Sequence, residues 1–152
     1  MSSVQPSAAD IAASAIAATA APTDADTAVA FGQLADVAGH ASTVLFNYRR
    51  DNPQAADLDR ALNLEMTLDQ RAIDLRVQAV KLLGAQAADA LAQLKDASQK
   101  VDDFLAGMKK LEGQLVIASA VVGLAGAALV GDAGGILAAV VGVHSALASA
   151  KS

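Results

Sequence analysis

The stretch from Leu115 to Ala150 constrains the fold most strongly, because it carries almost no charge. It contains one acid, Asp132, one histidine, His144, and no lysine or arginine. Two apolar runs flank the segment 131–135, where three glycines permit a turn. Each run predicts a helix of about 24 Å or less, somewhat short of the ~30 Å hydrocarbon core of a bilayer. Residues 113–152 are therefore predicted to form a helical hairpin, marginal for a membrane and very apolar for water.

The composition favours an all-α fold. Hydrophobic residues make up 54% of the 152 residues, which is enough for the core of one domain, but aromatic residues make up only 3%. Alanine, a strong helix former, supplies much of the apolar content. The net charge of −5 argues against a nucleic-acid partner, since phosphate binding needs a basic surface. The absence of cysteine excludes disulfides and thiol catalysis.

Residues 1–22 form an Ala/Ser/Thr-rich segment that is predicted to be a tail or a weak helix. It lacks the basic start and the continuous apolar core of a conventional secretory signal. Two interpretations stay open: a loosely ordered tail, or a signal for a specialised secretion machine. The expected location is accordingly outside the cell by a non-classical route, or at a membrane.

Residues 23–112 are predicted to form an amphipathic helical body, folded as one long hairpin. Thr23 is a candidate N-cap, and the acid Asp26 follows three residues later in the first turn. The first helix should end at 51–53, because a residue before proline is pushed out of the α region. Pro53 is predicted to begin a second helix that runs to about residue 112. Gly84 is its one candidate bend point, so the helix is either bent there or continuous over roughly 90 Å.

Apolar residues repeat at spacings of three and four along both body helices, as expected for a packing face in a bundle. The predicted packing stripe consists of Phe31, Leu34, Leu45, Tyr48, Ile73, Val77, Val80, Leu91, Leu94, Val101 and Leu105. A second stripe lies on another side of the earlier part of the second helix: Ala61, Leu64, Leu68, Leu75, Ala79 and Leu82. That part is therefore expected to pack between two neighbours.

Small residues recur every four positions along both arms of the apolar hairpin. The rows are Ser119, Gly123, Ala127 and Gly131 in the first arm, and Ala138, Gly142, Ala146 and Ala150 in the second. Such rows let helices approach closely and are a common basis of association in lipid. Chance is the competing explanation, since alanine and glycine dominate both arms. The candidate contacts with a membrane or with other copies of the chain are the residues of these two rows, together with Leu115, Asp132, Gly135 and His144. Lysines at both ends and an acid at the tip are typical of a hairpin inserted with both ends on one side.

Candidate catalytic chemistry is sparse. Asp36 and His40 are four residues apart and could share a proton or a metal, but no third ligand is near in sequence, and a solvated helix face is the alternative. His144 could control burial by pH, or it could simply reach water or a backbone carbonyl. Asp132 is expected to serve the turn. No catalytic, cofactor or metal site is predicted, no small-molecule substrate is evident, and the protein is not expected to be an enzyme.

Three functional hypotheses remain. The first is a membrane-active protein that inserts its apolar hairpin into a bilayer; this order of segments is similar to that of α-helical pore-forming toxins and of bacterial translocators, without a shared motif. The second is a self-assembling structural subunit whose hairpin is the buried core of a bundle or filament. The third is a small integral membrane protein of holin type, which the short apolar runs disfavour. The expected partners are accordingly a lipid bilayer, copies of the same chain, or both.

Overall fold

The structure is a computed structural model that describes residues 22–78, 80–107 and 110–150. This part of the chain folds into α-helices joined by shorter connections. The helices are α2 (Asp24–Asp51), α3 (Leu58–Val77), α4 (Ala87–Gly107), α5 (Leu111–Val130) and α6 (Ala133–Ala150). No strand forms within those ranges. The predicted all-α fold is confirmed. Residues 1–21 of the predicted N-terminal segment lie outside the described residues.

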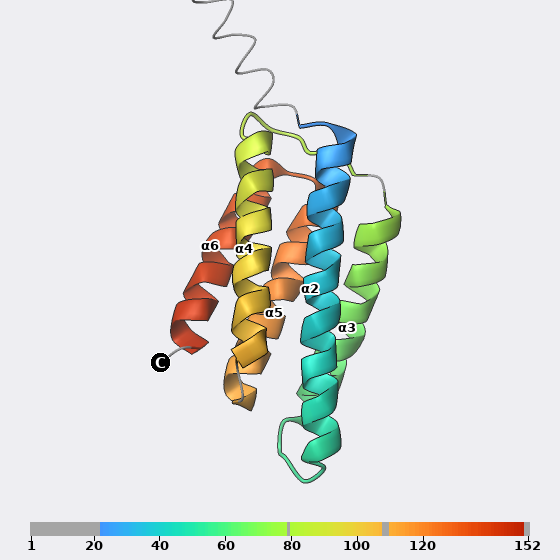
Figure 1. Cartoon of the computed structure of the whole chain (residues 1–152), viewed down its shortest axis with the longest axis vertical. Helices are drawn as coiled ribbons and strands as arrows, with labels where there is room; N and C mark the ends of the chain where they lie inside the picture. Colours follow the sequence, from blue (N-terminus) through green and yellow to red (C-terminus); the bar gives the residue numbers. More distant parts are fainter. Residues whose placement is uncertain (1–21, 79, 108–109, 151–152) are drawn as a thin grey trace, which may run out of the picture.

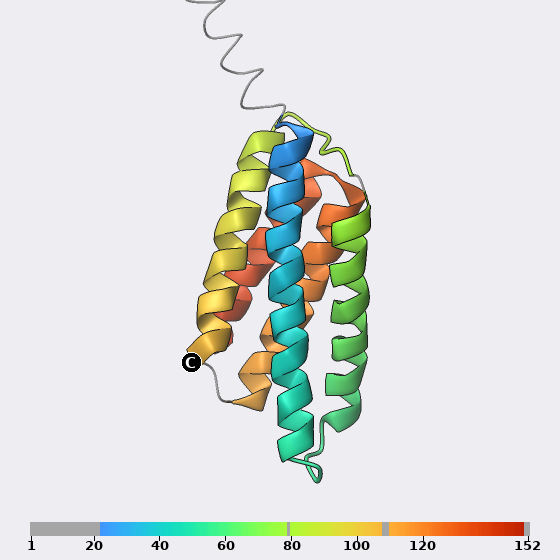
Figure 2. The same cartoon turned by 45° about the vertical axis from the view of Figure 1, so that its right-hand side comes forward.

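The five described helices form two layers in an up-and-down arrangement. One layer holds α3, α2 and α4, with α2 in the middle; α5 and α6 lie behind it (Figures 1 and 2). Helix α5 packs against α2 and α3, and α6 packs against α4 and α5. The apolar hairpin therefore shares one core with the body.

Helix α2 begins and ends where local sequence signals place its ends. The Thr23 hydroxyl accepts a hydrogen bond from the Asp26 amide at 3.0 Å, and the Asp26 carboxylate accepts one from the Thr23 amide at 3.3 Å. This reciprocal capping box satisfies two amides that a helix start leaves unpaired. The helix ends at Asp51, as predicted from the proline that follows.

The prediction that Pro53 starts the next helix is wrong. Helix α3 begins at Leu58. Asn52 instead closes α2, because both its backbone amide and its side-chain amide donate to the Tyr48 carbonyl, at 2.9 and 3.0 Å. Asn52 is thus committed to the end of α2, and a turn follows it before α3 starts.

A continuous second helix to residue 112 is also wrong. Helix α3 stops at Val77, and α4 starts only at Ala87; the described residues of the crossover between them, 78 and 80–86, are not helical and include Gly84 at φ +118°. The break folds α4 back along α2, so that the apolar faces of both helices reach the same core. The start of the hairpin, predicted at residue 113, is likewise displaced: Gly113 lies inside α5 and is buried, while Lys110 is the N-cap.

The predicted packing stripe is right in α2 and α4 and wrong in α3. Seven of its members are buried: Phe31, Leu34, Leu45, Leu91, Leu94, Val101 and Leu105. Tyr48 and Val80 are half-buried, whereas Ile73 and Val77 are 54% and 72% exposed. The core face of α3 is formed instead by members of the second predicted stripe, including Ala61, Leu68 and Leu75. The α4 register does not extend back to Ile73, because the non-helical crossover breaks the 3.6-residue phase.

A buried ion pair joins α2 to α3. The Arg49 guanidinium donates to both carboxylate oxygens of Glu65, with 2.9 Å between Nη2 and Oε1, and the Glu65 side chain is only 7% exposed. The hydrogen bond to Glu65 raises the pKa of Arg49 above its already high ordinary value, so the guanidinium stays charged at every pH at which the protein is studied. A bidentate pair of this kind fixes how the two helices align.

Candidate functional site

The C-terminal hairpin, α5 and α6, packs through one face of each helix. The largest fully buried side chains of that face are Leu115, Ile117, Val121, Leu124, Ile136 and Val143. Ile117, Val121 and Leu124 are three or four residues apart and lie on one side of α5, and Ile136 and Val143 are seven apart on one side of α6. Leu115, two residues before Ile117, lies outside that stripe in the first turns of α5. The hairpin therefore supplies a large share of the protein core.

Both hairpin helices are long and apolar enough to cross a membrane. The qualifying segments are Glu112–Val130 and Ala133–Ala150, of 19 and 18 residues, with mean hydropathies of 2.0 and 1.6. Helix α5, which starts four residues before the first predicted run, rises about 30 Å, enough to match a hydrocarbon core. A core helix passes the same test, but only 50% and 33% of the two segments are buried. After Glu112, only Ser119, Gly123 and Val130 of α5 are exposed, and most other apolar side chains of the hairpin are buried in the core or packed against it.

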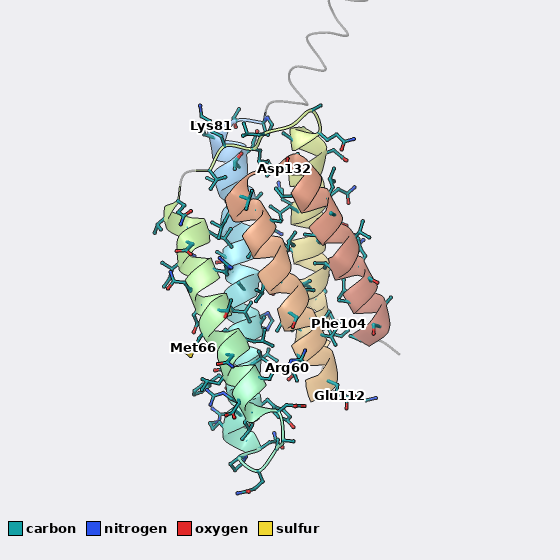
Figure 3. All side chains as sticks on the ribbon, turned by 180° about the vertical axis from the view of Figure 1, so that it is seen from behind. Arg60, Met66, Lys81, Phe104, Glu112 and Asp132 are labelled. Carbon is teal, nitrogen blue, oxygen red and sulfur yellow. The ribbon has the colours of Figure 1, made fainter. Side chains whose placement is uncertain are left out.

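The outward face of the hairpin is uncharged. Its exposed residues are Ser119, Gly123, Val130, Gly134, Ala138, Val141, Gly142, Ser145, Ala148 and Ser149. Seen from behind, α5 and α6 lie side by side over most of their length, with the acid Glu112 at the foot of α5 and the acid Asp132 at the tip (Figure 3). Small uncharged side chains between these two acids leave a broad, weakly apolar surface on the molecule.

Half of the residues in the predicted rows lie on this outer face. Ser119, Gly123, Ala138 and Gly142 are exposed, Ala127 and Ala150 are half-buried, and only Gly131 and Ala146 are buried. A Cβ added to Gly123 or Gly142 would meet no heavy atom of the surroundings within 4 Å. The two glycines thus do not bring α5 and α6 together in this fold, and a role for the rows in lipid or in an oligomer stays a prediction.

The tip of the hairpin is held by the crossover between α3 and α4. The Leu83 amide donates to the Gly131 carbonyl at 2.7 Å, and the Ala133 amide donates to the Leu83 carbonyl at 2.8 Å. These two bonds form an isolated parallel bridge between Leu83 and Asp132. We call the contacts of residues 80–84 with residues 131–133 the clasp. It fastens the top of the hairpin to the body.

Glycine is required at the centre of the clasp. Gly131 has φ +82°, in the left-handed region that other residues adopt at a cost. A Cβ at this position would lie 2.7 Å from the Lys81 carbonyl oxygen and 2.8 Å from the Val80 Cγ1 atom. The turn of the hairpin and the path of the crossover therefore depend on the same glycine.

Asp132 serves the turn, as predicted from its position. One carboxylate oxygen accepts a hydrogen bond from the Gly135 amide at 3.0 Å, which caps the start of α6. The side chain is exposed, and Figure 3 shows it at the same end of the molecule as Lys81. The turn itself is shorter than predicted, since Gly135 already belongs to α6.

Asp36 and His40, the two residues considered for proton sharing or metal binding, each contact a different partner. Asp36 accepts a bond from Arg76 of α3 at 2.7 Å, and His40 Nδ1 lies 2.7 Å from a carboxylate oxygen of Asp102 in α4. Both contacts are partly exposed and join neighbouring helices. Within the described ranges no three histidine or acidic side chains lie close enough together to hold a metal ion. His144 is half-buried on α6.

Sequence patterns do not predict the clasp or the Arg49–Glu65 pair. Gly84 and Gly131, the two glycines with positive φ, are both visible as interruptions of apolar runs, but nothing local indicates that their segments meet. Glu65 lies four residues after Ala61 and three before Leu68, both core residues. An acid at a core position of an amphipathic helix is the available signal for a buried ion pair.

No known family model, curated protein or solved structure matches the chain.

Proposed function

We propose that this protein is membrane-active: it is folded as a compact helical bundle in water and releases the α5–α6 hairpin into a lipid bilayer. One observation carries the proposal. The hairpin combines two helices of membrane-spanning length with an outer face that has no charged residue from Gly113 to Val130 or in α6. The exposed side chains of this face are small, with only Val130 and Val141 as large apolar ones, so the support comes from the length and hydropathy of the two helices and from the absence of charge.

The hairpin is suited to leaving the body. A helix satisfies its own backbone hydrogen bonds, so α5 and α6 can enter hydrocarbon without exposing unpaired amides. The inner-face leucines, isoleucines and valines, which favour insertion, would then contact lipid instead of the core. The clasp is the polar connection that holds the tip, and its two inter-segment hydrogen bonds must break for the hairpin to swing out.

Asp132 is the only charged residue that the tip would carry across the bilayer. Protonating its carboxyl group removes that charge and also weakens the hydrogen bond to the Gly135 amide. Acid is therefore expected to favour insertion. Lysines near both ends of the hairpin would remain on the side from which it enters.

Liposome binding and dye release test this function with Gly123→Arg and Gly142→Arg. Neither glycine has a neighbour within 4 Å of an added Cβ, so the water-soluble fold should keep its helical content and melting temperature. In a bilayer, a central arginine costs about 2.5–3.5 kcal/mol, which corresponds to a loss of membrane affinity of roughly a hundredfold. The matched control is Gly39→Arg in α2, where an added Cβ also meets nothing within 4 Å.

The proposal predicts that the two hairpin variants lose dye release while Gly39→Arg behaves as the wild type. Equal release from all three variants would contradict insertion of the hairpin. A second candidate, a self-assembling structural subunit, is favoured by the same uncharged face, which could instead cover a second copy. That alternative predicts that the wild type is an oligomer in sedimentation experiments and that Gly123→Arg dissociates it. It also predicts that the protein does not bind liposomes.

A further inference from the structure

A cavity of about 430 Å³ lies between the start of α2, the end of α3 and the beginning of the crossover. Its volume is within the range of small-molecule sites, roughly 300–1,000 Å³. The large apolar residues that border it are Phe31 of α2 and Leu75 of α3, which are 2% and 3% exposed, and the half-buried Val80 of the crossover. On α2, Ala28 and Gly32 leave the space open, because neither side chain extends far from the helix.

Three charged residues line the cavity. Two cations, Arg76 and Lys81, and one acid, Asp24, line it, although the whole chain carries a net charge of −5. Arg76 is already bonded to Asp36. Lys81 is exposed, and Figure 3 shows it near the first turn of α2. An apolar chamber with an exposed lysine at its border matches a ligand that is apolar along its length and negative at one end.

The wall that carries Lys81 is fixed in place. Gly131 lies close to the Lys81 carbonyl and to the Val80 side chain, and Leu83 is bonded to the hairpin tip through both its amide and its carbonyl. A wall that does not have to be ordered on binding lowers the entropic cost of association. The part of the cavity wall next to Lys81 is therefore tied to the tip of the hairpin.

From these observations we propose that this cavity binds a single-chain carboxylate, a medium- or long-chain fatty acid, with the alkyl chain against Phe31, Leu75 and Val80 and the carboxylate at Lys81. This inference does not rest on the proposed function, because the site is formed by the water-soluble fold and is tested without a membrane. Fatty acid in solution is the ligand, and no bilayer is needed for the binding.

Titration with decanoate, followed by amide NMR shifts, tests the proposal. The amides of Phe31, Leu75 and Lys81 should shift in the wild type, and their concentration dependence gives the affinity. Gly32→Leu fills the chamber and should weaken binding at least tenfold. Its matched control is Gly39→Leu, seven residues further along α2; an added Cβ meets no atom within 4 Å at either glycine. Both changes replace a helical glycine by a better helix former, so both variants should fold.

Charge is tested separately from shape. Lys81→Gln should weaken decanoate binding about threefold to fivefold, as expected for an exposed pair, while Lys95→Gln on α4 should leave it unchanged. Decyltrimethylammonium, with the same chain length and the opposite charge, should bind more weakly than decanoate. Three results would overturn the assignment: equal affinities for Gly32→Leu and Gly39→Leu, decyltrimethylammonium binding as tightly as decanoate, or shifts confined to α5 and α6.

Discussion

Replacing Gly131 by alanine should destabilise the protein through the clasp. An alanine at φ +82° costs about 1–2 kcal/mol in the left-handed region. Its Cβ would also lie 2.7 Å from the Lys81 carbonyl oxygen, too close for the crossover to keep its path. If the crossover moves away, the two hydrogen bonds of Leu83 are lost, at about 0.5–1.5 kcal/mol each. The expected loss in the free energy of unfolding is therefore about 2–5 kcal/mol.

Urea unfolding followed by circular dichroism measures this loss. With a urea dependence of about 2 kcal/mol per molar, typical of a small domain, the midpoint should fall by about 1–2.5 M. The control is Gly123→Ala, in the middle of α5, where an added Cβ meets nothing and the better helix former should stabilise by up to about 1 kcal/mol. Hydrogen exchange should quicken at the Leu83 and Ala133 amides in Gly131→Ala. A midpoint for Gly131→Ala equal to that of Gly123→Ala would refute the clasp.

Five further substitutions test the register of α3, the core and the tip of the hairpin. Ile73→Asp, on the exposed side of α3, should change the unfolding free energy by only about 0.5 kcal/mol. Leu75→Asp, on the buried side, should cost several kcal/mol. Similar melting temperatures for the two variants would show that the register of α3 is wrong. Leu94→Asp should likewise cost several kcal/mol, while Lys100→Ala, which removes an exposed pair, should cost under about 1 kcal/mol in the same thermal melts. Asp132→Asn should release dye from liposomes at neutral pH without acid, and an unchanged pH response would show that the tip does not sense acid.

Sequence patterns predict an element well where a local interaction defines it. Helix α2 follows from the Thr23–Asp26 capping box and from the proline after its last turn. The hairpin turn follows from Gly131, which interrupts two apolar runs. In each case the residues that fix the boundary lie within a few positions of it, so that one segment of sequence contains the whole cause.

The break between α3 and α4 could not be predicted in this way. Residues 77–83 are mostly helix-compatible, and only Gly84 indicates an interruption. The crossover is held open by bonds from Leu83 to the tip of the hairpin, almost fifty residues further along the chain. Without the break, the apolar register of α4 extends back into α3 and places Ile73 and Val77 on the wrong side of that helix. The membrane role of the hairpin depends on an environment outside the folded chain, and it stays a prediction.

A reversible lock on the clasp tests most directly whether the hairpin leaves the body. The chain has no cysteine, so Leu83→Cys combined with Asp132→Cys introduces a single thiol pair. Bridge partners on neighbouring strands have Cα atoms about 5 Å apart, within the range for a disulfide. Dye release from liposomes is measured for the oxidised and the reduced form of this same protein, with wild type under both conditions as control. Release by the reduced form and none by the oxidised form is the predicted result. Equal release by both forms, with the disulfide verified by mass, would contradict the release of the hairpin.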